Sequence, residues 1–115
     1  HCISSAASDV YKRQPDARWT EAAGFPYAGT YIGFEAVLEH VFKRLGSEWQ
    51  DFTFKVENYV AQGDKVFAYG NYQGVYKASG KPIDVRVAHL WTLKDGKVTH
   101  FEQFVDSHSV QLAML

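Results

Sequence analysis

The chain has 115 residues, of which 46% are hydrophobic and 22% are charged, and its formal net charge at pH 7 is -1. These values predict one soluble globular domain and exclude the strongly basic surface by which proteins bind nucleic acid or anionic membranes. A single cysteine excludes an internal disulfide framework, and no apolar run is long enough to span a membrane. We therefore expect a cytoplasmic domain with no nucleic-acid or membrane partner.

Residues 1–14 show neither helical nor strand periodicity and are too polar to be a signal peptide. The string SSAASDVYKRQ within them resembles translated adapter sequence. We expect this leader to be non-native or disordered, and the folded domain to comprise residues 15–115.

The first patterned segment is a short strand, in which Trp19 and Glu21 are two positions apart and are predicted to share one face. Apolar residues then recur at helical spacing, which predicts a helix from about Phe34 to Leu45 with Gly46 as its C-terminal cap. Between the two we expect a loop built on Gly24, Pro26 and Gly29.

Three further segments alternate between apolar and polar residues, as strands with one buried face do. They are residues 52–60, residues 66–77 and a β-hairpin within residues 83–106. Long strands joined by tight turns after one helix predict an α+β domain with a curved antiparallel sheet and helices on one side. A short helix is expected for Ser107–Leu115.

The hairpin turn at Lys94-Asp95-Gly96 allows two registers that differ by one residue. A two-residue loop would place four polar side chains on the face that should be buried. A three-residue loop sets His89 opposite Phe101 and Val87 opposite Gln103, which makes that face mostly apolar. We predict the three-residue loop, because a one-residue slip moves every side chain of a strand to the other face.

In this register His89 and Gln103 are isolated polar groups on an apolar strand face. Protein sites for small molecules are mostly apolar and contain a few polar groups that orient the ligand. The hairpin therefore predicts a ligand cavity over this face.

Seven short motifs follow one another along the chain: Trp19-Thr20-Glu21, Gly33-Phe34-Glu35-Ala36-Val37, Gly63-Asp64-Lys65-Val66, Ser79-Gly80, His89-Leu90-Trp91, Asp95-Gly96-Lys97-Val98 and Phe101-Glu102-Gln103-Phe104-Val105-Asp106. In their order and spacing, from about Asp16 to Leu115, the chain resembles the SnoaL-like branch of the nuclear transport factor 2-like superfamily. The resemblance implies a cone-shaped pocket in a curved sheet with helices on the concave side. It also implies one or two leading helices, which have no counterpart here, so we expect an N-terminally truncated domain.

Two activities of the superfamily need residues that this chain lacks. The polyketide cyclases place a histidine and an acid on the last two strands; His89 matches the histidine, but Gln103 stands at the acid position and cannot take up a proton. The limonene epoxide hydrolases have an acid at that last-strand position too, and an Arg and an Asp on the middle strand where this chain has Gly70 and Tyr72. The resemblance therefore argues against both reactions.

A third activity, that of the ketosteroid isomerases, uses a general base near the end of the first strand, where this chain has Glu21. A carboxylate in apolar surroundings beside Trp19 has its pKa raised toward the range of a useful base. The alternative is a solvated acid at the mouth of the pocket. His89 has two interpretations as well: an orienting or proton-donating partner, or a hydrogen-bonded core residue. Glu21 and His89 are thus the candidate catalytic residues.

The candidate ligand-binding residues belong to the predicted concave face or to the helix that covers it. Tyr72 and Gln103 could orient a ligand carbonyl, whereas the apolar members would line the pocket. The set is Trp19, Phe42, Tyr72, Val87, Trp91, Phe101, Gln103 and Val105. No cofactor is implied, and the histidines show no paired spacing for a metal.

Two classes of function remain. The first is a pocket protein that binds a small apolar molecule or transforms it by proton transfer, as an isomerase, lyase or cyclase does. The second is a non-catalytic ligand-binding or protein-interaction domain. Membership of a fold does not decide between them.

The other face of the sheet predicts an assembly. Phe67, Tyr69, Ala88, Leu90 and Phe104 lie on it, which is too apolar for a fully wetted surface. The resemblance implies dimerisation through this face, and we expect a homodimer.

Overall fold

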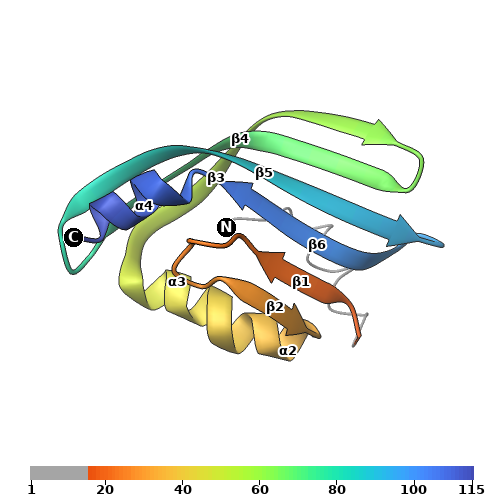
Figure 1. Cartoon of the computed structure of the whole chain (residues 1–115), viewed down its shortest axis with the longest axis horizontal. Helices are drawn as coiled ribbons and strands as arrows, with labels where there is room; N and C mark the ends of the chain where they lie inside the picture. The colour runs from red at the N-terminus through yellow and green to blue at the C-terminus, as the bar shows by residue number, and fades with distance from the viewer. Residues whose placement is uncertain (1–15) are drawn as a thin grey trace.

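The computed structural model describes residues 16–115, so the predicted leader lies outside the described part of the chain. Its strands form one curved, six-stranded sheet in the order β2-β1-β6-β5-β4-β3, and the helices lie on the concave side (Figure 1). The predicted α+β class is confirmed. The strands are β1 (Arg18–Glu21), β2 (Gly29–Ile32), β3 (Trp49–Gln62), β4 (Lys65–Tyr76), β5 (Lys81–Lys94) and β6 (Lys97–Val105). The helical segments are α2 (Phe34–Val37), the π-helix η1 (Leu38–Phe42), α3 (Lys43–Glu48) and α4 (Ser107–Ala113).

The sheet is antiparallel except at one place, where β1 lies parallel to β6. This pairing joins the first strand of the described chain to the last. The alternation of residues predicts every strand except β2, but it does not predict the parallel pairing, because strand partners are chosen by long-range packing.

β3 and β4 approach each other closely at Gly70 of β4. The pairing of β3 with β4 changes register between Gln50 and Thr53 and again between Val56 and Asn58. A Cβ atom at Gly70 would lie 1.9 Å from the carbonyl oxygen of Lys55. Any side chain there would push the strands apart, so glycine is required for the close approach beside the second irregularity.

The β5–β6 turn differs from the prediction. Asp95 and Gly96 both have positive φ, 53° and 74°, and Lys94 pairs with Lys97. This is the two-residue turn whose twist suits a hairpin, so the predicted three-residue loop is wrong.

The buried face of the hairpin is nevertheless the predicted one, because a bulge changes the register of β6. Thr92 pairs with His100 and Leu93 with Val98, which leaves Thr99 as an extra residue on β6. The bulge moves every later side chain to the opposite face, as a one-residue slip does. His89 therefore faces Gln103 rather than Phe101.

The helical segment runs continuously from Phe34 to Glu48 and is longer than predicted. Gly46 lies inside α3, so its predicted role as a C-terminal cap is wrong. The helix ends instead at Trp49, whose extended backbone (φ -122°, ψ 147°) leads directly into β3. The structure also contains a strand where the sequence predicted only a loop: Gly29–Ile32 forms β2 and pairs with β1.

The C-terminal helix α4 agrees with the prediction and has a side-chain cap. The Asp106 carboxylate accepts hydrogen bonds from the Ser109 backbone N–H (3.1 Å) and hydroxyl (2.7 Å). A side-chain acceptor satisfies donors that the first turn of a helix leaves unpaired. The cap turns the chain after β6 so that α4 lies under the curve of the sheet (Figure 1).

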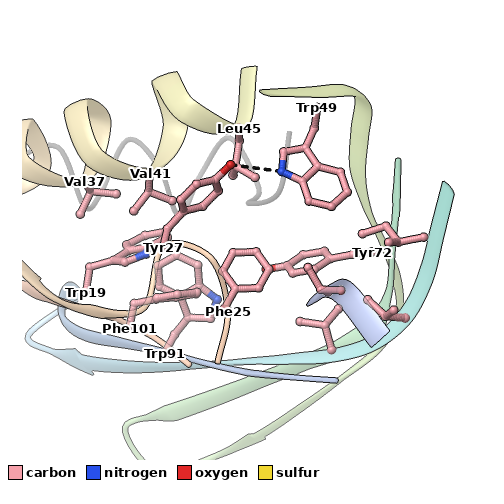
Figure 2. Packing of buried hydrophobic residues seen from close by; sticks show 14 of the residues in the cluster. Trp19, Phe25, Tyr27, Val37, Val41, Leu45, Trp49, Tyr72, Trp91 and Phe101 are labelled. Atoms are coloured by element: carbon pink, nitrogen blue, oxygen red, sulfur yellow. Dashed lines mark hydrogen bonds between the residues drawn. The ribbon is translucent and has the colours of Figure 1, made fainter. Parts of the chain in front are cut away.

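The core is largely aromatic. Trp19 stacks on Phe101 with ring centroids 3.8 Å apart, and Trp91 meets Trp19 edge-on at 5.7 Å. Figure 2 shows the helix side chains Val37, Val41 and Leu45 pointing into this core, with Leu45 beside Tyr27 and Trp49. The helical stripe predicted from the sequence thus covers the concave face of the sheet.

Candidate functional site

Three buried polar side chains form a row across β1, β6 and β5. Trp19 is paired with Phe101 in the parallel register, which brings Glu21 level with Gln103, and Gln103 faces His89 on the next strand. The exposed fractions are 4% for Glu21, 2% for Gln103 and 1% for His89. The row thus unites both candidate catalytic residues with the amide that replaces the expected acid. Because neighbouring strands are about 4.8 Å apart, the backbones of Glu21 and His89 are separated by ~10 Å.

Glu21 ends β1 and is buried beside Trp19. Burial raises the pKa of its carboxyl from 4.5 to about 8, although the Trp19 indole N–H, 3.2 Å from Oε2, favours the ionised form and lowers the pKa in part. Glu21 is therefore mostly protonated at neutral pH and exchanges its proton just above it. This is the behaviour expected of a buried base, not of a solvated acid.

His89 is neutral. Burial lowers the pKa of its imidazole from 6.5 to about 3, so the ring carries one proton and no charge at neutral pH. Phe54 and Phe101 flank the ring, with centroids 4.4 Å and 4.7 Å away. In this state His89 can donate or accept a hydrogen bond but cannot supply a proton as an imidazolium acid.

Gln103 and Tyr72 connect the row through hydrogen bonds. The Gln103 Oε1 atom accepts from the Ala22 backbone N–H at 3.0 Å, and its Nε2 atom donates to the Tyr72 hydroxyl at 3.0 Å. The same hydroxyl lies 2.5 Å from Nε2 of His89. Both ends of the amide are thus held by the protein, which fixes its orientation.

The predicted ligand-binding residues come together on the concave face and in the helix above it. Trp19, Tyr72, Val87, Trp91, Phe101 and Gln103 are buried, and Phe42 and Val105 are partly buried against the same cluster. The Phe42 and Trp19 rings are perpendicular, with centroids 5.4 Å apart. An apolar face of this kind suits an apolar ligand.

The sequence interpretation missed two aromatic residues of β3 that pack against the row. Phe52 and Phe54 lie 4.8 Å and 5.5 Å from the Tyr72 ring. They alternate with polar residues, so the signal was present. The strand was predicted from that alternation, but its face could not be assigned without the pairing of Phe54 with Tyr72.

A second hydrogen-bonded cluster fastens the loop before β2 to the end of α3. The Tyr27 hydroxyl donates to Oε1 of Glu48 at 2.6 Å and accepts from the Trp49 indole N–H at 3.1 Å (Figure 2). Arg44 lies over the Tyr27 ring, 4.4 Å from its centroid, and also hydrogen-bonds Glu48. Burial and the neighbouring Glu48 raise the pKa of Tyr27 above its ordinary value. The contacts indicate a structural role, because the Tyr27 hydroxyl both donates and accepts a hydrogen bond within the protein.

Within residues 16–115, no group of three or more His, Cys, Asp or Glu side chains is arranged to hold a metal ion. None of the helices in this part of the chain is long and apolar enough to cross a membrane.

Residues 10–101 match the family model of the SnoaL-like domain. Among solved structures, an NTF2-like protein from Burkholderia thailandensis is 44% identical, with a TM-score of 0.89 over 96% of this chain and 85% of the other. No protein with a curated description matches the chain.

Two more distant structures share the fold. A protein from Jannaschia, assigned provisionally as a SnoaL-like polyketide cyclase, is 24% identical over 92% of this chain and 76% of its own, with a TM-score of 0.78. A protein from Catenulispora acidiphila with a ketosteroid isomerase-like fold, in complex with trimethylamine, is 17% identical over 96% of this chain and 82% of its own, with a TM-score of 0.79.

Proposed function

Because this chain belongs to the SnoaL-like domain family, we propose that it binds a small apolar molecule at its concave face and transforms it by proton transfer. The reaction class is that of an isomerase, lyase or cyclase, with Glu21 as the general base. The observation that carries the proposal is the buried Glu21 carboxyl, whose pKa of about 8 lies close to neutral pH.

The chemistry assigned to Glu21 is the removal of a proton from a carbon next to a carbonyl group. The C–H bond breaks, the proton goes to the Glu21 carboxylate, and the bonding electrons move onto the carbonyl oxygen to form an enolate. Where the substrate has a double bond between its β and γ carbons, the product is a dienolate, and return of the proton from Glu21 to the γ carbon completes an isomerisation by moving the double bond into conjugation with the carbonyl group. His89, being neutral, serves as a hydrogen-bond partner rather than as a source of a proton.

The second candidate is a non-catalytic ligand-binding or protein-interaction domain. Two observations favour it: the acid expected opposite His89 is the amide Gln103, and the low pKa of His89 prevents its acting as an acid at neutral pH. A binding protein would retain the aromatic face and have no turnover to lose.

A ligand screen followed by one substitution separates the two. Ketones, lactones and aromatic polyketide fragments are screened by thermal shift, and each binder is assayed for conversion by wild type, Glu21→Gln and Glu102→Gln. Glu102 is the matched control, because it is exposed on the outer face of β6, one residue from Gln103. We expect Glu21→Gln to lower turnover ~10²- to 10⁴-fold, with affinity changed only a few-fold and Glu102→Gln silent.

Other outcomes identify the part that fails. Conversion that survives Glu21→Gln would exclude Glu21 as the base. Binders that are never converted, but are lost in Trp19→Ala or Phe101→Ala, would establish the non-catalytic alternative.

We also propose a homodimer formed through the convex face of the sheet, and the cytoplasm as its compartment. Phe104 is 45% exposed on this face, and its ring centroid is 6.4 Å from that of Phe67. Phe67, Tyr69, Ala88 and Leu90 surround it as half-buried neighbours, and such a patch favours a protein contact. Light scattering should give a dimer that Phe104→Asp converts to monomer and Tyr59→Asp, at another exposed aromatic residue, does not. A wild-type monomer at tens of micromolar would refute the dimer.

A further inference from the structure

The hydrogen bonds of the buried row have a direction, which is set at one end by the backbone of Ala22. A backbone N–H can only donate, so the atom of Gln103 that faces Ala22 at 3.0 Å is the oxygen. The amide nitrogen therefore faces the Tyr72 hydroxyl, and an amide NH₂ can only donate as well. The Tyr72 oxygen accepts from Gln103, and its own proton must point away from Gln103.

The next bond, between Tyr72 and Nε2 of His89, has two possible arrangements. Either the phenol donates to an unprotonated imidazole nitrogen, or an imidazole N–H donates to the phenol oxygen. A phenol is a stronger acid than a neutral imidazole, and an imidazole nitrogen is a better acceptor than a phenol oxygen. The first arrangement is favoured, so a neutral His89 carries its one proton on Nδ1.

Nδ1 of His89 has no hydrogen-bond partner among residues 16–115. The side chain is 1% exposed and packs between the rings of Phe54 and Phe101, neither of which offers an acceptor. A buried N–H without a partner costs free energy, and such groups are rare in proteins unless something binds them.

We propose that Gln103 acts through Tyr72 as a positioning residue that holds His89 as its Nδ1–H tautomer, and that this N–H binds a carbonyl oxygen of the ligand. The binding of a ligand carbonyl rests on the proposed function, and the tautomer of His89 does not. The Gln103 amide then determines ligand specificity. It directs the Tyr72 hydroxyl proton toward His89, so the site selects ligands that accept a hydrogen bond from the His89 Nδ1–H.

The tautomer is measured without any ligand, by nitrogen NMR on the full chain labelled in the histidine rings. Wild type should show His89 with Nδ1 protonated and Nε2 unprotonated throughout the neutral and alkaline range. Of the described titratable side chains, Tyr72 on β4 is hydrogen-bonded to the imidazole, and Glu21 on β1 lies two strands away. A wild-type His89 with its proton on Nε2, or a mixture of both forms, would overturn the assignment.

The role of Gln103 is tested by Gln103→Glu. Where the introduced carboxyl is protonated, it still donates to Tyr72 and the wild-type tautomer persists. Where it is ionised, it only accepts, so Tyr72 turns its proton toward it and His89 must donate from Nε2. We expect the tautomer to reverse with rising pH in Gln103→Glu and to stay unchanged in Gln62→Glu, a control at the exposed end of β3. A Gln103→Glu protein that keeps Nδ1–H at every pH would overturn the positioning role. If this variant does not fold, Tyr72→Phe takes its place, because it removes the donor to Nε2 of His89. It should populate the tautomer protonated on Nε2, and an unchanged spectrum would likewise overturn the positioning role.

The ligand class is tested with two molecules of nearly the same shape, α-tetralone, which has a carbonyl group, and tetralin, which has none. The His89 Nδ1–H resonance should move downfield when α-tetralone is added and should stay in place with tetralin. If the chemical shift of the Nδ1–H does not change with α-tetralone at saturation or up to its solubility limit, the proposal that this N–H binds a ligand carbonyl is overturned. Neither result depends on turnover, so loss of the proposed catalysis and loss of this inference are recognised separately.

Discussion

The burial of Glu21 predicts a pH dependence of the protein's stability, which can be measured without a substrate. In the folded protein the pKa of Glu21 is about 8, and in the unfolded chain it returns to 4.5. The folded state therefore binds this proton more tightly than the unfolded state does. Stability from the neutral carboxyl is fully present below pH 4.5 and is lost progressively as the pH rises to about 8.

The magnitude follows from the two pKa values. Each pH unit between them costs about 1.4 kcal/mol of unfolding free energy, so the whole interval costs roughly 5 kcal/mol. The side chain is almost fully buried, so solvent screening does not reduce the figure much. A small domain has only about 5–15 kcal/mol in total, so the effect is a large share of its stability.

The substitution Glu21→Gln removes this proton and keeps an oxygen acceptor for the Trp19 indole. Urea unfolding of both proteins should show Glu21→Gln gaining stability on wild type as the pH rises from 4.5 to about 8, with a constant difference above that range. Glu102→Gln, at an exposed position, should show no such trend. A stability difference between Glu21→Gln and wild type that does not change with pH would mean that Glu21 is not buried as a neutral acid, and the argument for a buried base would fail with it.

Three further predictions concern the site and the scaffold. For any substrate found, kcat/KM should rise with pH and level off above about 8, because only ionised Glu21 accepts a proton; a profile that falls over this range would contradict a base. Gly46→Ala should stabilise the protein by about 0.5–1 kcal/mol in urea unfolding, since Gly46 is inside α3 with open space around its Cβ position, whereas a C-cap glycine would give a loss. Gly70→Ala should destabilise the protein by at least about 1–3 kcal/mol and lower its thermal midpoint, because the added methyl group would meet the Lys55 carbonyl. An unchanged midpoint would refute the close approach.

Much of the concave face could be predicted from the sequence, because a strand repeats every two residues and a helix every 3.6 or so. Alternation placed Trp19 with Glu21 on one face of β1, and helical spacing placed the apolar stripe above the sheet. The motifs around His89 and Gln103 led to the SnoaL-like family, which the comparison with known proteins confirms.

What alternation could not show is which strands are neighbours and in what register. Thr99 is an ordinary residue of β6 in the sequence, yet its bulge is what sets His89 opposite Gln103. The parallel pairing of β1 with β6 brings Glu21 level with that pair. The two strands are separated by most of the described sequence, so local patterns could not predict that they are neighbours.

The sequence by itself thus determined the elements other than β2, the buried faces of β1, of the hairpin and of the helix, and the residue types available for chemistry. Only the tertiary structure decided that Glu21 is buried enough to have a raised pKa, and that both ends of the Gln103 amide are engaged. The physical reason is that propensity and periodicity act over a few neighbouring residues. Desolvation and hydrogen-bond direction depend instead on groups such as the Ala22 N–H and the Tyr72 hydroxyl, which are far from Gln103 in the sequence.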